Sequence, residues 1–273
     1  MKTVFPKIFQ EFIPLLKKSG MSDSDINTLE RNIKSKMEEE EPPKIAWVGL
    51  CGVGKSSTIN ALFNAGQEIN HVVACTKEAK EIYSDVSKYI GSKGKEIIVY
   101  DMPGLGEDIE EDIKHLESYA KVLPKVDVVV WTISAGDRKM GPEQEALLKL
   151  KNNFGNKFTD RLVVVVNKAD IIAPGETEWN KTLNMPSLEQ MSNLEEFEEY
   201  VRKKIKKVLP DWKGGLVTYS AKYAFRLDIL MNTIMEAVPI KRRWVYGQCA
   251  DVADFTQFID PQYREYIDEL MEK

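Results

Sequence analysis

An eight-residue stretch, Gly49-Leu-Cys-Gly-Val-Gly-Lys-Ser56, constrains this chain more than any other feature. It follows the apolar run of residues 44–48 and precedes residues 57–63, whose apolar side chains have helical spacing. Glycines followed by Lys55 and Ser56, between a strand and a helix, are typical of a loop that binds phosphates and Mg²⁺. A glycine-rich turn that matches by chance is the alternative. The residues expected to bind nucleotide here are Gly52, Val53, Gly54, Lys55, Ser56 and Ser57.

Length, composition and cysteine content exclude several classes of protein, among them membrane-spanning and disulfide-rich secreted ones. A chain of 273 residues holds one ordinary domain with extra elements, or two small domains. No apolar run approaches the roughly 18 residues of a membrane-spanning helix, and the first six residues do not resemble a signal peptide. Three cysteines provide neither a disulfide framework nor metal-ligand spacing. We therefore expect a cytoplasmic protein, and its net charge of −5 argues against general nucleic-acid binding.

From residue 44 onward, strand-like runs alternate with helical patterns. Runs such as Leu162-Val-Val-Val-Val166 are typical of central strands in a parallel sheet, and Gly91-Ser-Lys-Gly94 predicts a hairpin turn. We predict an α/β fold with a six-stranded, mostly parallel sheet and one antiparallel edge strand. The strands are expected at 44–49, 81–86, 95–100, 126–133, 161–166 and 215–219, and the helices near 55–64, 108–122, 142–153, 190–208 and 222–237.

The flanking segments have helical patterns of their own. Residues 3–18 read as a helix that Pro14 should kink or divide, and a second helix starts near Ser22. We predict an N-terminal helical extension at 1–43, a nucleotide-binding domain at 44–238, and a C-terminal helical extension at 239–273 that packs on that domain. A polar insertion, residues 173–190, is expected between the fifth strand and its helix, and a last helix at 261–272. The amphipathic N-terminal segment leaves a peripheral position at a membrane open.

Two further signals predict a magnesium and γ-phosphate site. Thr76 lies in the loop after the first helix of the domain, where its hydroxyl could reach Mg²⁺ only when a triphosphate orders the loop. Asp101-Met-Pro-Gly104 follows the third strand. Asp101 would hold Mg²⁺ through water, and Gly104 would bring its N–H to the γ-phosphate. The expected metal ligands are Ser56, Thr76 and Asp101, and Lys55, Thr76 and Gly104 are the expected catalytic residues.

Two motifs at later strand ends predict which base is bound. Asn167-Lys-Ala-Asp170 follows the fifth strand, and its carboxylate can accept hydrogen bonds from the N1–H and amino group of guanine. Adenine lacks these donors and would leave a buried carboxylate unpaired, so the motif selects guanine. Ser220-Ala-Lys222 follows the sixth strand, where a backbone N–H can meet the guanine carbonyl. The base-side residues are therefore Asn167, Lys168, Asp170, Ser220, Ala221 and Lys222.

Together these motifs resemble the translation-factor-related P-loop GTPases over roughly residues 44–238. The runs GVGKSS-x-INALF and DMPGLGE, with a Cys-Thr pair, look like the Era/septin-like group, especially its YfjP/YeeP-type members. Helical flanks are also similar to those of immunity-related and dynamin-like GTPases. The resemblance implies a Ras-like fold and a Mg²⁺-dependent GTPase that converts GTP to GDP and phosphate. It also implies that the loops around Thr76 and Gly104 change with the nucleotide.

One departure bears on the mechanism. Ras-type switches place a glutamine after the D-x-P-G motif to orient water, whereas Leu105 stands here. We therefore expect slow hydrolysis, on the order of 10⁻⁴ to 10⁻² s⁻¹, with water positioned by the backbone, by Thr76, by a carboxylate such as Glu107 or Asp108, or by a group from another subunit. Arg138 is a candidate for contact across a dimer. The alternative is a nucleotide-gated scaffold with negligible turnover. A homodimer across the nucleotide face is possible. Contacts with the ribosome, RNA or a membrane are also possible, although no dedicated motif in the sequence indicates them.

Overall fold

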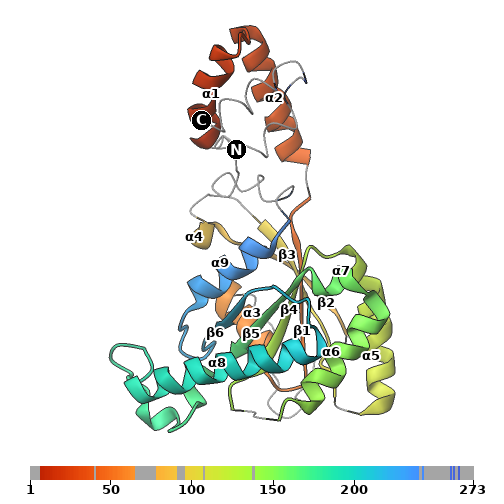
Figure 1. Cartoon of the computed structure of the whole chain (residues 1–273), viewed down its shortest axis with the longest axis vertical. Helices are drawn as coiled ribbons and strands as arrows, with labels where there is room; N and C mark the ends of the chain where they lie inside the picture. The colour runs from red at the N-terminus through yellow and green to blue at the C-terminus, as the bar shows by residue number, and fades with distance from the viewer. Residues whose placement is uncertain are drawn as a thin grey trace. The chain divides into compact units, whose positions relative to one another are not determined.

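The structure of the chain is a computed structural model (Figure 1). It describes residues 7–39, 41–64, 78–90, 96–106, 108–136 and 139–239, together with residues 242, 259, 261 and 264. The described residues fall into two compact units. One consists of residues 43–89 and 96–238; the other is drawn mainly from the N-terminal residues up to 42 and from residues after 238.

The larger unit is built on one six-stranded sheet with strand order β2-β3-β1-β4-β5-β6. Strand β2 pairs antiparallel with β3, and all other neighbours are parallel. The predicted fold class is therefore confirmed. The strands are β1 (Lys44–Gly49), β2 (Lys80–Asp85), β3 (Glu96–Asp101), β4 (Val128–Ser134), β5 (Leu162–Asn167) and β6 (Leu216–Thr218).

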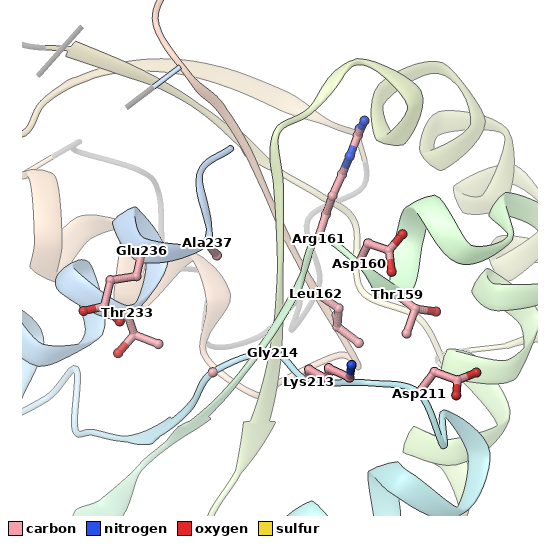
Figure 2. Close-up of a pocket in the computed structure, with 11 residues that line it drawn as sticks. Thr159, Asp160, Arg161, Leu162, Asp211, Lys213, Gly214, Thr233, Glu236 and Ala237 are labelled. Carbon is pink, nitrogen blue, oxygen red and sulfur yellow. The ribbon is translucent and has the colours of Figure 1, made fainter. Parts of the chain in front are cut away.

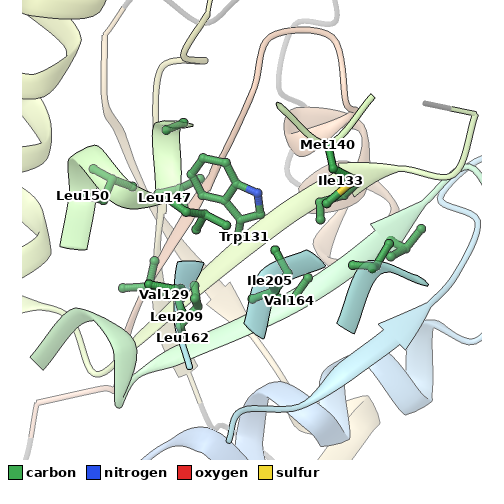
Figure 3. Packing of buried hydrophobic residues seen from close by; sticks show 14 of the residues in the cluster. Val129, Trp131, Ile133, Met140, Leu147, Leu150, Leu162, Val164, Ile205 and Leu209 are labelled. Carbon is green, nitrogen blue, oxygen red and sulfur yellow. The ribbon is translucent and has the colours of Figure 1, made fainter. Parts of the chain in front are cut away.

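Alternate residues of the central strands face opposite sides of the sheet, as strand geometry requires. In β4, Val129, Trp131 and Ile133 join a cluster of buried side chains on one face, which Figure 3 shows. Residues Leu147 and Ile205 join this cluster from two of the helices that cover that face. These helices are α5 (Ile109–Val122), α6 (Gly141–Phe154) and α8 (Leu188–Val208).

The other face of the sheet is covered by α3 (Lys55–Phe63), which contacts β1 and β3, and by α9 (Leu227–Ala237), which contacts β4, β5 and β6. Leu62 and Ile234 are fully buried in these helices. The helix expected at 222–237 begins five residues later than predicted. Residues 221–226 instead form a turn closed by a bridge between Ser220 and Phe225.

Short elements complete the connections of the larger unit. The segment expected as an insertion contains one 3₁₀ turn, at Glu176–Glu178, and a bridge between Asn180 and Met185, and it leads into the start of α8 (Figure 1). The remaining elements are α4 (Ser87–Ile90), α7 (Asn156–Thr159), and the 3₁₀ turns η1 (Leu123–Lys125), η2 (Ala169–Ile171) and η3 (Glu176–Glu178).

The smaller unit contains two helices, α1 (Lys7–Lys18) and α2 (Asp23–Glu39). Pro14, expected to kink or divide the first helix, does not divide it, since α1 continues through it. An internal proline removes one hydrogen bond and costs about 3 kcal/mol. Burial of Phe9, Phe12 and Leu16 on the same helix offsets that cost. The helix expected at 261–272 lies outside the described residues, apart from Pro261 and Arg264. Within the described part of the chain, no helix is long and apolar enough to cross a membrane.

Candidate nucleotide-binding site

The loop between β1 and α3 curls because two glycines adopt conformations that other residues avoid. Gly52 has a φ of 75°, and Gly54, the residue before α3, has a φ of 94°. Lys55 is 6% exposed, and its Nζ donates to the carbonyls of Gly49 and Leu50 at 3.3 and 3.0 Å. Burial lowers the pKa of Lys55 to about 8, although the nearby carboxylates of Asp101 and Glu143 act in the opposite direction. The sequence-predicted loop therefore holds a buried lysine at the start of a helix.

The structure brings two of the three expected metal ligands together. Ser56 Oγ donates to Asp101 Oδ2 at 2.7 Å, and Asp101 is 1% exposed. A hydroxyl and a buried carboxylate are oxygen donors of the kind that Mg²⁺ binds alongside phosphate oxygens, so these residues fit that ion. Thr76, the third expected ligand, lies outside the described residues.

Gly104 lies against the phosphate loop so closely that no side chain fits. A Cβ atom added there would be 2.8 Å from Cys51 Cα and 3.1 Å from Lys55 Nζ. The adjoining Leu105 is buried, and its backbone forms a bridge with Leu50. Tyr119 Oη of α5 donates to the carbonyl of Pro103 at 2.8 Å, which ties this segment to α5.

Of the side chains expected to position the attacking water, the structure describes Asp108 but not Glu107. Asp108 caps α5, because its Oδ1 accepts from the Glu111 N–H at 2.8 Å. Glu107 and Arg138 lie outside the described residues. Leu105, being apolar, offers no hydrogen bond to water.

Cys51 of the phosphate loop differs from what the sequence predicted for the cysteines. It is disulfide-bonded, and its partner lies outside the described residues. One bond is not a framework, but the expected cytoplasmic location, where thiols are usually kept reduced, does not account for it.

Asn167 connects the phosphate loop to the two base-side loops. Its Nδ2 donates to the carbonyl of Val53 at 3.1 Å, and its Oδ1 accepts from the N–H of Ala221 at 3.1 Å. A Cβ on Gly54 would lie 2.4 Å from the same amide nitrogen. Lys168 reaches back to the carbonyl of Gly52 at 2.8 Å. The residues expected at the phosphates and at the base thus form one hydrogen-bonded set.

Asp170 and Ser220 complete the base side. Asp170 is 3% exposed and Ser220 is fully buried, and the Ser220 hydroxyl donates to Asp170 Oδ1 at 2.5 Å. This bond orients the carboxylate at the end of β5. Lys222 is exposed and pairs with Glu176 of the insertion, while Ser57 is half-buried on α3.

Sequence reasoning missed several residues that position these loops. Tyr119, Gln190 and the aromatic cluster around Trp179 contact the loops over long sequence separations. Nothing local in the sequence marks such contacts. The one available signal was the Ser187–Gln190 capping box at the start of α8.

A separate pocket of about 770 Å³ lies at the opposite end of the strands from these loops, beside the amino ends of β5 and β6 (Figure 2). Its lining mixes acidic side chains such as Asp160 and Glu236 with basic ones such as Arg161 and Lys213. It contains none of the residues predicted from the sequence to bind nucleotide.

Comparison with known families supports the prediction that the site binds a nucleotide. Residues 44–168 match the family model described as 50S ribosome-binding GTPase. In Escherichia coli K12, the uncharacterized protein YfjP is 27% identical over 154 residues, which cover 56% of this chain and 48% of YfjP. YkfA of the same organism is 31% identical over 134 residues, covering 48% of this chain and 43% of YkfA. The chain thus spans less than half the length of these two relatives.

The solved structures agree on the architecture. Era from Aquifex aeolicus, crystallised with GDP·AlF₄⁻, superposes with a TM-score of 0.54 and 22% identity over 73% of this chain and 58% of Era. The fold is that of the P-loop GTPases. Together with the family match, this supports GTP binding by residues 44–168 at the level of the domain.

Proposed function

We propose that this protein is a Mg²⁺-dependent GTPase that binds GTP and hydrolyses it slowly to GDP and phosphate. The observation that carries the proposal is the base side of the site. A buried carboxylate, Asp170, is oriented by Ser220, and Asn167 joins both loops to the phosphate loop. Guanine supplies two donors for such a carboxylate, whereas adenine supplies none at those positions.

The phosphate side supplies the expected charge. Lys55 would contact the β- and γ-phosphates, and Ser56 with Asp101 would hold Mg²⁺, which neutralises charge that develops on the phosphates. Gly104 would offer its N–H to the γ-phosphate. Thr76 is proposed to complete the metal site when its loop orders around a triphosphate. The loops around Thr76 and Gly104 would then differ between the GTP and GDP forms.

Slow turnover is proposed because Leu105 is apolar and 3% exposed where a water-orienting glutamine stands in Ras-type switches. The same observation favours the second candidate, a nucleotide-gated scaffold that binds GTP and scarcely hydrolyses it. A homodimer across the nucleotide face would supply the missing group in the first case.

Nucleotide binding and single-turnover hydrolysis by the purified protein test the proposal. We expect GDP and GTP to bind the wild type, and Lys55→Ala to lose binding, because a buried positive charge at the phosphates is removed. Lys157→Ala, an exposed lysine on α7, is the matched control and should bind as the wild type does. No binding of guanine nucleotide by the wild type would contradict the proposal.

Protein concentration then separates the two candidates. Hydrolysis that accelerates as the protein concentration rises indicates a GTPase activated by self-association. Hydrolysis at a constant low rate indicates a slow GTPase that acts alone. Tight binding with no turnover at any concentration indicates the scaffold.

A further inference from the structure

Of the predicted insertion, only residues 173–187 precede α8, and from here on the insertion means this segment, which is fixed to the loop that carries Asp170. The side chain of Gln190, at the start of α8, is fully buried, and its Nε2 lies within hydrogen-bond distance of three backbone carbonyls along this path. The acceptors are the carbonyls of Asp170, Ile172 and Gly175, at 3.2, 3.4 and 3.0 Å. The insertion therefore starts from a fixed point next to the base-recognition carboxylate.

An aromatic cluster joins the insertion to the other base-side loop. Trp179 is 3% exposed and stacks on Tyr223, with ring centroids 5.2 Å apart and planes inclined by 21°. Its ring also meets Phe225 edge-on at 5.3 Å. Tyr223 and Phe225 follow Ser220-Ala-Lys222 directly. Stacked and edge-to-face rings attract one another beyond the effect of burial alone.

Polar contacts join the same two segments. Glu176 Oε1 accepts from Tyr223 Oη at 2.7 Å and from Lys222 Nζ at 2.5 Å. Hydrogen bonds from Lys222 and then Tyr223 lower the pKa of Glu176, so the carboxylate stays ionised near neutral pH. Asn184 Nδ2 donates to the carbonyl of Tyr223 at 2.6 Å. Because Glu176 and Lys222 are partly exposed, their ion pair contributes less than the ring contacts do.

The loop held by these contacts adopts backbone conformations that are unfavourable for residues with a Cβ atom. Ala224 has a φ of 50° and Arg226 a φ of 55°. Such conformations persist where surrounding contacts over-determine them. The insertion thus contacts the loop from which the Ala221 N–H donates to Asn167 Oδ1.

We propose that Trp179 and Glu176 are positioning residues that hold the 220–226 loop against the guanine base and thereby set the rate at which GDP leaves. This inference rests on the proposed function, because it assumes that guanine lies between Asp170 and Ala221. Opening of the Trp179–Tyr223 stack is the step that releases the base. Among the described residues, no contact joins the insertion to a residue that we place at the phosphates, so we expect it to act on nucleotide release rather than on hydrolysis.

Displacement of a fluorescent GDP analogue by excess GDP measures this release rate directly. We expect Trp179→Leu to speed release about three- to tenfold and Glu176→Gln about two- to threefold, with association rates unchanged. Trp179→Phe should restore nearly the wild-type rate, because it keeps the ring contacts and removes an indole N–H that has no acceptor among the described residues.

Two matched controls separate positioning from general destabilisation. Glu178→Gln alters an exposed carboxylate of the same 3₁₀ turn and should release GDP at the wild-type rate. Trp212→Leu removes an indole that is 1% exposed and bonded to the carbonyl of Leu162, at the amino end of β5. It should lower the melting temperature without speeding GDP release.

Each outcome bears on one proposal or on both. Unchanged GDP release from Trp179→Leu and Glu176→Gln, in variants that still bind GDP, would overturn the positioning role and leave the proposed function intact. Equal acceleration by Trp212→Leu would also overturn it, since loss of stability alone would explain the effect. If the wild type does not bind GDP, both proposals fail. If Trp179→Leu does not fold, Glu176→Gln against Glu178→Gln decides the question.

Discussion

Lys55 carries its charge in a buried position, and this position makes nucleotide binding depend on pH. Desolvation lowers its pKa to about 8, whereas an exposed lysine has a pKa near 10.5. Phosphate groups beside Nζ favour the charged form, so the bound state takes up a proton wherever the free protein has lost it. Affinity is therefore highest below pH 8 and falls as the pH rises through that value.

We predict uptake of roughly one proton per GDP bound at about pH 9, and little uptake at about pH 7.5, where Lys55 is mostly charged already. Isothermal titration calorimetry in buffers of different ionisation enthalpy measures this number. Lys55→Arg is the control, since arginine keeps its charge throughout this range. Equal proton uptake by wild type and Lys55→Arg at pH 9 would contradict the assignment.

Gly104 supplies a second residue-scale prediction, because its site has no room for a Cβ atom. Gly104→Ala would place a methyl group 2.8 Å from Cys51 Cα, so we expect the free energy of unfolding to fall by about 1–3 kcal/mol. Gly141→Ala is the matched control, since nothing lies within 4 Å of a Cβ there and the residue begins α6. Urea unfolding of both variants checks the prediction, and equal stability of the two would refute it.

At the scale of elements, helix α6 shows how one face of the sheet is sealed. Its neighbouring residues Leu147 and Leu148 have the same side chain, yet Leu147 is fully buried against the sheet and Leu148 is 38% exposed. The difference follows from helical periodicity, because successive residues point about 100° apart. Figure 3 shows Leu147 beside Trp131 of β4.

This pair gives a prediction on packing. Leu147→Ala should lower the free energy of unfolding by about 2–5 kcal/mol, because it leaves a cavity in the core. Leu148→Ala should lower it by less than about 1 kcal/mol, because little of its surface leaves water on folding. Thermal or urea unfolding of the two variants measures the contrast. A similar loss in both would mean that α6 is not packed as described.

Much of this architecture could be predicted from the sequence, because the central strands β1, β4 and β5 are apolar runs and most loop motifs follow a strand end. The antiparallel edge strand followed from the short spacing between β2 and β3. The path of residues 173–187 could not be predicted, because its conformation is set by Trp179 and Gln190 through contacts with distant residues. The continuation of α1 through Pro14 could not be predicted for a similar reason, since tertiary burial outweighs the local cost of proline.

At the scale of the whole larger unit, the sheet separates two sites. The described motifs that we assign to nucleotide gather at the carboxyl ends of the parallel strands, where ligands bind in open α/β sheets. Asn167 links three of these loops through its hydrogen bonds to Val53 and Ala221. The pocket at the amino ends of β5 and β6 has no such link to the nucleotide residues among the described contacts.

The central claim is that Asp170 selects guanine, and the most direct test is to change which base it can accept. Asp170→Asn replaces an acceptor by a donor, and xanthine carries a carbonyl where guanine carries its amino group. We predict that the wild type binds GDP far more tightly than XDP, and that Asp170→Asn reverses this order while its melting temperature stays close to that of the wild type. If Asp170→Asn binds GDP as tightly as the wild type does, Asp170 does not read the base and the account is wrong.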